Sequence, residues 1–163
     1  MALEILVSEH IVIHVLRKEL FEVIIDFKRL PEFFDFILRV EELDDLSYSS
    51  VGKKYLEFVK GPIFSTRPVL LELTEIEYPS RVKIQTDGRL FGHTIQINFR
   101  QNNKQQTELE LIYVIRKNLI LFYLPGIERI FRKRLTDGLL NIKKYAERVN
   151  NQNIVQAASQ VFK

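Results

Sequence analysis

The sequence contains no cysteine and no tryptophan, and it has only six glycines and five prolines in 163 residues. The absence of cysteine excludes disulfides, thiolate catalysis and cysteine-ligated zinc or iron–sulfur centres, and it fits a reducing compartment. Long hydrophobic runs are also missing, because the longest apolar stretch, Leu119–Leu124, is far shorter than the ~20 residues that span a bilayer. Since no basic leader opens the chain, we expect a soluble, cytoplasmic protein.

Excess charge of one sign is small, because 24 basic and 21 acidic residues give a formal net charge of +3. The two signs are interspersed, so no basic stripe indicates a nucleic-acid partner. The sequence has neither a glycine-rich phosphate loop nor a serine nucleophile motif, and we expect no cofactor. Of the three histidines, His10 and His14 share one face of a predicted strand and His93 points elsewhere, so we expect no metal site.

The spacing of the apolar residues predicts one strand, two helical segments, a run of strands and one long helix. Alternating apolar residues mark the strands, and apolar residues at helical spacing mark the helices. The predicted strands are Glu9–Leu16, Arg39–Asp45, Lys53–Lys60, Arg67–Glu77, Arg81–Thr86, Leu90–Arg100 and Thr107–Arg116, and the predicted helices are Lys18–Phe27, a short helix after Pro31 and a long helix from about Pro125 to Val149. We therefore expect one domain over residues 1–149, followed by a C-terminal tail over residues 150–163.

This order of elements predicts an α+β fold with an internal cavity. Strands that follow one another along the chain form an antiparallel sheet, and a sheet of about six to seven strands twists and curls. The long C-terminal helix must then cover the concave face. Because one helix cannot fill a strongly curled sheet, the remaining space is an apolar pocket and the default ligand site.

The sequence resembles the START-like (SRPBCC) superfamily, which has the helix-grip fold. The entry segment "HIVIHV" followed by "LFEVIIDFKRLPEFFDFI" is similar to the family's strand and helix–Pro–helix entry, and "VGKKYLEF", "VLLELTEIEYPSRVKIQTDG" and "HTIQINFRQNNKQQTELELIYVI" are similar to its meander. The segment "LPGIERIFRKRLTDGLLNIKKYAERV" resembles its gripping helix. The resemblance covers residues 9–149 and implies a protein of the polyketide-cyclase type, which encloses a lipid-like, quinone-like or polyketide-like molecule.

Strand parity indicates which side chains line the predicted cavity. His93 and Tyr113 are polar groups on otherwise apolar faces, so each needs a hydrogen bond from a ligand, the backbone, water or the other residue. Gly138 lies on the apolar stripe of the long helix, where either close packing or room for a ligand explains the missing side chain. The apolar candidates for ligand binding are Phe91, Ile95, Ile97, Phe99, Leu109, Leu111, Phe131 and Leu135.

Three functions follow from this interpretation. The first is the binding or carrying of a small hydrophobic or amphipathic molecule, with the ligand oriented by His93 and Tyr113. The second is a cyclase or dehydratase that uses the same pair as its acid and base. The third is docking on a protein or membrane through Leu119–Leu124, through the tail, or through the basic residues that follow Pro125, which are Arg129, Arg132, Lys133 and Arg134. The protein is expected to be a monomer or homodimer.

Overall fold

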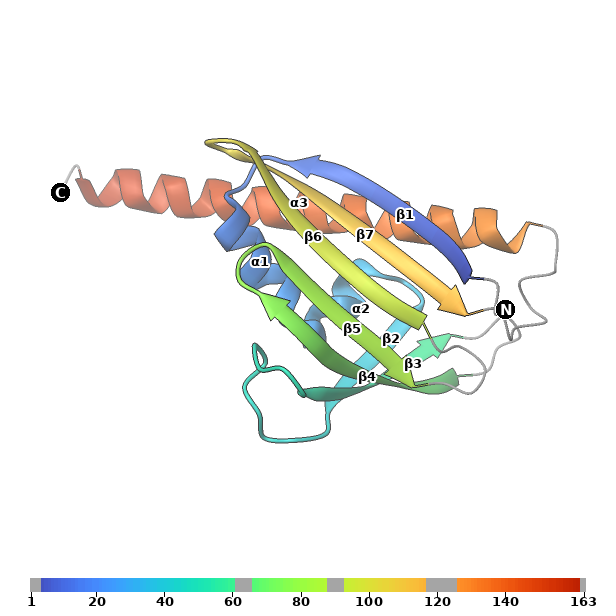
Figure 1. Ribbon diagram of the computed structural model, residues 1–163. Coiled ribbons are helices and arrows are strands. Elements are labelled where there is room, and N and C mark those ends of the chain that lie inside the picture. The colour runs from blue at the N-terminus through green and yellow to red at the C-terminus, as the bar shows by residue number, and fades with distance from the viewer. Residues whose placement is uncertain (1–3, 61–65, 88–92, 117–125, 162–163) are drawn as a thin grey trace.

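The computed structural model describes residues 4–60, 66–87, 93–116 and 126–161. Seven strands and three α-helices follow in the predicted order (Figure 1). The elements are β1 (Glu4–Ile13), α1 (Arg17–Ile25), the 3-10 turn η1 (Phe27–Arg29), α2 (Leu30–Phe33), β2 (Ile37–Glu42), β3 (Lys54–Lys60), β4 (Thr66–Glu77), β5 (Arg81–Asp87), β6 (His93–Asn103), β7 (Gln106–Arg116) and α3 (Ile127–Val161). The segment Leu119–Leu124, one of the predicted docking segments, lies outside the described residues.

The seven strands form one antiparallel sheet in the order β1-β7-β6-β5-β4-β3-β2. The sheet curls, and α3 runs along its open side while α1 and α2 cover one end (Figure 1). The first strand begins earlier than predicted, because every residue from Glu4 to Ile13 pairs with β7. The predicted α+β helix-grip architecture is thereby confirmed.

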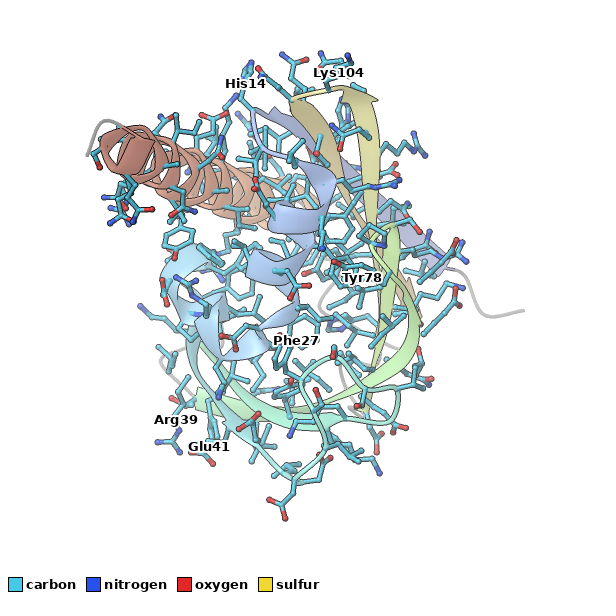
Figure 2. The ribbon with its side chains drawn as sticks, turned by 90° about the vertical axis from the view of Figure 1, so that its left-hand side faces the viewer. His14, Phe27, Arg39, Glu41, Tyr78 and Lys104 are labelled. Atoms are coloured by element: carbon cyan, nitrogen blue, oxygen red, sulfur yellow. The ribbon has the colours of Figure 1, made fainter. Side chains whose placement is uncertain are left out.

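A dense hydrophobic core fills the end of the sheet next to α1. The ring of Phe21 lies 5.2 Å from Phe99 and 5.0 Å from Tyr78, while Phe27 lies 5.4 Å from Tyr55. Figure 2 shows Phe27 among the side chains of the interior, whereas the charged residues of β2 point away from it. These large rings leave the α1 end of the fold closed.

Gly138 is explained by close packing between α3 and α2. A Cβ atom at this position would project directly into the ring of Phe34. On either side of Gly138, the buried residues Leu135, Leu139, Ile142 and Ala146 of α3 face the sheet. Of the two explanations open from the sequence, the contact with Phe34 therefore accounts for the glycine.

α3 continues well past Val149, the residue at which the sequence pattern predicted its end. The helix reaches Val161, and its C-terminal part projects beyond the sheet (Figure 1). Residues 151–157, 159 and 160 are exposed. The segment predicted as a separate tail is thus mainly the outer end of the same helix. Within the described part of the chain, no helix is both long and apolar enough to cross a membrane.

Candidate functional site

The inward faces of β6 and β7 carry most of the residues predicted to bind a ligand. The register places Ile95 opposite Tyr113, Ile97 opposite Leu111 and Phe99 opposite Leu109. These pairs share the face that is covered by α3, as strand parity predicted. Phe91 lies outside the described residues.

Packing along this inward face is uneven. Ile97, Phe99, Leu109 and Leu111 are buried in the core, and so is Leu135 of α3. By contrast, Ile95, Tyr113 and Phe131 retain accessible surface although they pack against the core. The predicted residues therefore divide into a closed group and an open group.

His93 begins β6 at the open end and is held by Thr86 of β5. The backbone N–H of His93 donates to Thr86 Oγ1 at 2.9 Å, and the Thr86 hydroxyl donates to the carbonyl oxygen of His93 at 3.0 Å. The imidazole Nδ1 lies 3.2 Å from the same hydroxyl. A neighbouring side chain thus fixes the imidazole, whose ring centroid lies 5.6 Å from that of Tyr113.

The structure adds an acidic residue that sequence reasoning missed. Glu57 of β3 lies opposite Val69 of β4 and is only 8% exposed. Its carboxyl group has no hydrogen bond or ion pair within the part of the chain that the structure describes. Burial raises the pKa of Glu57 to about 7. The group therefore changes its charge near neutral pH.

Tyr113 lies close enough to Glu57 for the two groups to interact electrostatically. Desolvation raises the pKa of the Tyr113 hydroxyl above its usual value, and the charge of Glu57 raises it further. The ring of Phe131 from α3 stands edge-on to Tyr113 at 5.2 Å. We refer to Glu57, Thr86, His93 and Tyr113 as the inner polar cluster, because all four lie on the inward face of the sheet.

The chemistry available in the inner polar cluster is that of a carboxyl, an imidazole and two hydroxyls beside aromatic rings. Such groups can accept or donate protons and can orient the polar end of an apolar molecule. Among the described residues, no three histidine, aspartate or glutamate side chains gather as a metal site would require. His10 is exposed, and His14 contacts Glu147 of α3 at 3.0 Å.

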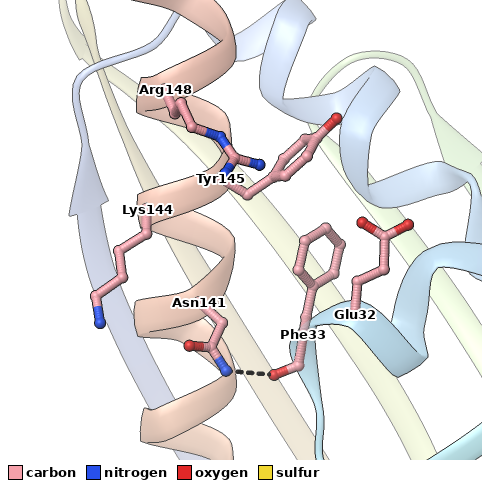
Figure 3. Close-up of a pocket in the computed structure, with 6 residues that line it drawn as sticks. All are labelled: Glu32, Phe33, Asn141, Lys144, Tyr145 and Arg148. Carbon is pink, nitrogen blue, oxygen red and sulfur yellow. Dashed lines mark hydrogen bonds between the residues drawn. The ribbon is translucent and has the colours of Figure 1, made fainter.

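A separate surface groove of about 390 Å³ lies between α2 and α3 and contains none of the predicted residues (Figure 3). Its side chains are largely engaged with one another or with the adjacent Arg29. Asn141 Nδ2 donates to the carbonyl oxygen of Phe33 at 2.9 Å. The Arg29 guanidinium pairs with Glu32 at 2.9 Å and lies 4.2 Å from the Tyr145 ring centroid. These contacts hold α2 against α3. The groove is therefore explained by the packing of the two helices and not by a ligand.

No protein-family profile and no curated protein matches the chain by sequence. Solved structures match its fold. A protein from Deinococcus radiodurans is similar with a TM-score of 0.67 and 21% identity, over 88% of this chain and 98% of the other. A START superfamily protein from Mycobacterium smegmatis gives a TM-score of 0.64 and 12% identity, over 90% and 97% of the two chains.

A third similar structure is the di-domain aromatase/cyclase StfQ of the steffimycin biosynthetic pathway. The TM-score is 0.73 and the identity 11%, over 91% of this chain and 53% of StfQ, so the chain spans about half the length of that protein. These likenesses confirm the predicted START-like fold. Proteins with this fold include ligand binders and cyclases.

Proposed function

We propose that the protein encloses a small apolar or amphipathic molecule between the curled sheet and α3, with the polar end of that molecule at the inner polar cluster. The observation that carries the proposal concerns Tyr113. Its hydroxyl is desolvated, yet the side chain retains accessible surface. This combination is expected of a side chain that lines an internal space rather than the outer surface.

Apolar neighbours of Tyr113 support the same proposal. Ile95 and Phe131 pack against the core and also retain accessible surface, whereas Ile97, Phe99, Leu109 and Leu111 are fully packed. A ligand that covers such surface gains roughly 25 cal/mol for each Å² of apolar area removed from water. Most of the affinity would therefore come from apolar contact, and the polar cluster would set the orientation.

The experiment that tests the proposal is native mass spectrometry of gently purified protein, followed by organic extraction of any bound molecule. We expect a stoichiometric apolar or amphipathic adduct. Ile95→Phe, which fills the proposed space, should remove it. Ile112→Phe is the matched control, because Ile112 lies on the neighbouring strand β7 and on the opposite face of the sheet. A clean apo mass that does not change when fatty alcohols, amines, quinones or polyphenols are added would contradict the proposal.

A cyclase or dehydratase remains a second candidate function, and Glu57 is the observation that favours it. A general acid or base works best when its pKa lies near the working pH, and the Glu57 pKa of about 7 meets that condition. His93 and Tyr113, the pair predicted from the sequence, lie at the same end of the site. The test is to incubate the extracted molecule with the protein and to compare its mass and chromatographic retention before and after. Catalysis requires that the wild type changes the molecule, and that Glu57→Gln binds it without changing it.

A further inference from the structure

Glu57 differs from the other buried charged residue of the described chain, Lys53. Lys53 is 1% exposed and is fully paired, because its ammonium lies 3.4 Å from Glu42 and 3.2 Å from Asp44. The ammonium also donates to the carbonyl oxygen of Asp44 at 2.6 Å. Glu57 has no such partner among the described residues. A buried carboxylate without a partner is costly, so a ligand that supplies one would bind with a large gain.

Two aromatic side chains on the inward side of the sheet also suit a positively charged partner. Tyr113 and Phe131 present two aromatic rings at nearly right angles, with an interplanar angle of 86°. Aromatic faces attract cations within about 6 Å of the ring centroid, and the attraction strengthens when water is excluded. A buried carboxyl that acts electrostatically on one of two packed aromatic rings therefore combines two features that hold an ammonium group.

None of the other charged or titratable groups among the described residues pairs with the Glu57 carboxyl. Tyr55 shares the face of Glu57 on β3, His93 comes from β6, and Arg67 shares the inward face of β4 with Val69. Arg67 is not free, since it has an interaction of its own. Arg134 of α3 lies over the ring of Phe36 at 5.7 Å. Neither arginine contributes to the pKa of Glu57, which is set by burial.

We propose that the polar end of the enclosed molecule is an amine or ammonium group, held by the Glu57 carboxylate against the rings of Tyr113 and Phe131. This inference rests on the proposed function and specifies its ligand class. It also implies that fatty acids and other carboxylates are disfavoured, because Glu57 repels a second negative charge at this end. The ligand class is thus an amphipathic amine.

The pH dependence of binding follows from the same arrangement. Glu57 is half ionised at about pH 7 in the empty protein, and an alkylamine stays protonated well above that pH. Amine binding should therefore strengthen as the pH rises from 6 to 8, because a larger fraction of Glu57 is already ionised. Binding of a neutral alcohol of the same length should not strengthen over this range.

The test is isothermal titration calorimetry with n-octylamine, 1-octanol and octanoate at pH 6 and pH 8. At pH 8 we expect octylamine to bind at least about tenfold more tightly than octanoate. Glu57→Gln should abolish this preference. Glu72→Gln should keep it, since Glu72 lies on the outer face of β4 beside Lys54. Phe131→Leu should weaken octylamine binding more than octanol binding, and circular dichroism checks that each variant is folded.

The possible outcomes separate the two proposals. If octanol and octanoate bind as tightly as octylamine, or if Glu57→Gln keeps the preference for the amine, the inference about the amine is wrong and the enclosure of a ligand stands. If none of the three compounds binds to the folded wild type, the proposed enclosure is contradicted, and the inference is contradicted with it.

Discussion

Glu57 and Tyr113 interact across the inside of the sheet, although three strands separate β3 from β7 in the strand order. In a flat sheet with neighbouring strands ~4.8 Å apart, the two backbones would be roughly 19 Å from each other. The influence of the Glu57 charge on the pKa of Tyr113 therefore reflects the curl of the sheet. Curling brings a carboxyl and a phenol from distant strands into one site.

Glu57 should make the protein less stable as the pH rises. Its pKa is about 7 in the folded protein and 4.5 in the absence of the fold, so the folded state holds the proton more tightly between these values. The resulting stabilisation is complete below pH 4.5 and is lost as the pH rises through 7, by on the order of 3 kcal/mol. Glu57→Gln cannot ionise, so the free energy of unfolding of the variant should exceed that of the wild type increasingly towards pH 8.

Urea denaturation at pH 5, 6.5 and 8 measures this difference. Glu72→Gln serves as the control, because Glu72 is partly exposed beside Lys54. A constant difference between Glu57→Gln and the wild type at all three pH values would show that Glu57 does not titrate in this range.

Gly138→Ala should destabilise the fold through its contact with Phe34. The added methyl group would meet the Phe34 ring, and overpacking of this kind typically costs about 1–3 kcal/mol. Phe34→Leu should recover part of the loss in the double variant, because the smaller side chain makes room for the methyl group. Thermal unfolding monitored by circular dichroism measures the effect. Thr136→Ala, an exposed position on the same helix, is the control and should change stability by less than about 0.5 kcal/mol.

Glu147→Ala should loosen the attachment of α3 to the end of β1. Glu147 accepts a hydrogen bond from the backbone N–H of His14 at 2.9 Å and contacts the His14 ring at 3.0 Å. Removing this partly exposed contact should cost about 1 kcal/mol. Asp137→Ala removes the exposed pair with Lys133 instead and should have a smaller effect. Hydrogen exchange at residues 13–15 provides the readout, and unchanged exchange in Glu147→Ala would refute the role of this contact.

Deleting residues 151–163 should leave the fold and the ligand site intact. The described side chains of this segment are exposed, including Ile154 and Val155, so few contacts are lost. The melting temperature and the amount of co-purified small molecule should match those of the full chain. A large loss of either would assign the outer end of α3 a role in holding the ligand space together.

The order of elements and the inward faces of β6 and β7 could be predicted because their patterns are regular. Each of these strands has one face that is almost wholly apolar. Along β3, both faces contain apolar residues: Tyr55 and Val59 on one side, Leu56 and Phe58 on the other. The sequence of β3 therefore does not reveal which face is buried, and this is why Glu57 was missed.

The end of α3 was misplaced for a related reason. The change to a polar sequence at Asn150 predicts the end of the helix, yet no glycine or proline follows Gly138 to stop it. Polarity after residue 149 marks the point where the helix leaves the body of the protein. In the acidic segment before β3, Glu42 and Asp44 hold the buried Lys53. A pairing of that kind depends on tertiary packing that sequence spacing does not show.

α3 is a single helix of 35 residues, which corresponds to a rod about 52 Å long. Its first part lies against the sheet, where Leu135, Leu139, Ile142 and Ala146 are buried, and its C-terminal part extends into solvent (Figure 1). Contacts on both sides of Gly138, from Arg132 to Glu9 and from Glu147 to His14, hold the buried part in place. Because an α-helix is continuous, these contacts also set the direction of the projecting part. The exposed residues 151–157 are therefore held at a defined position relative to the sheet and do not form a loose tail.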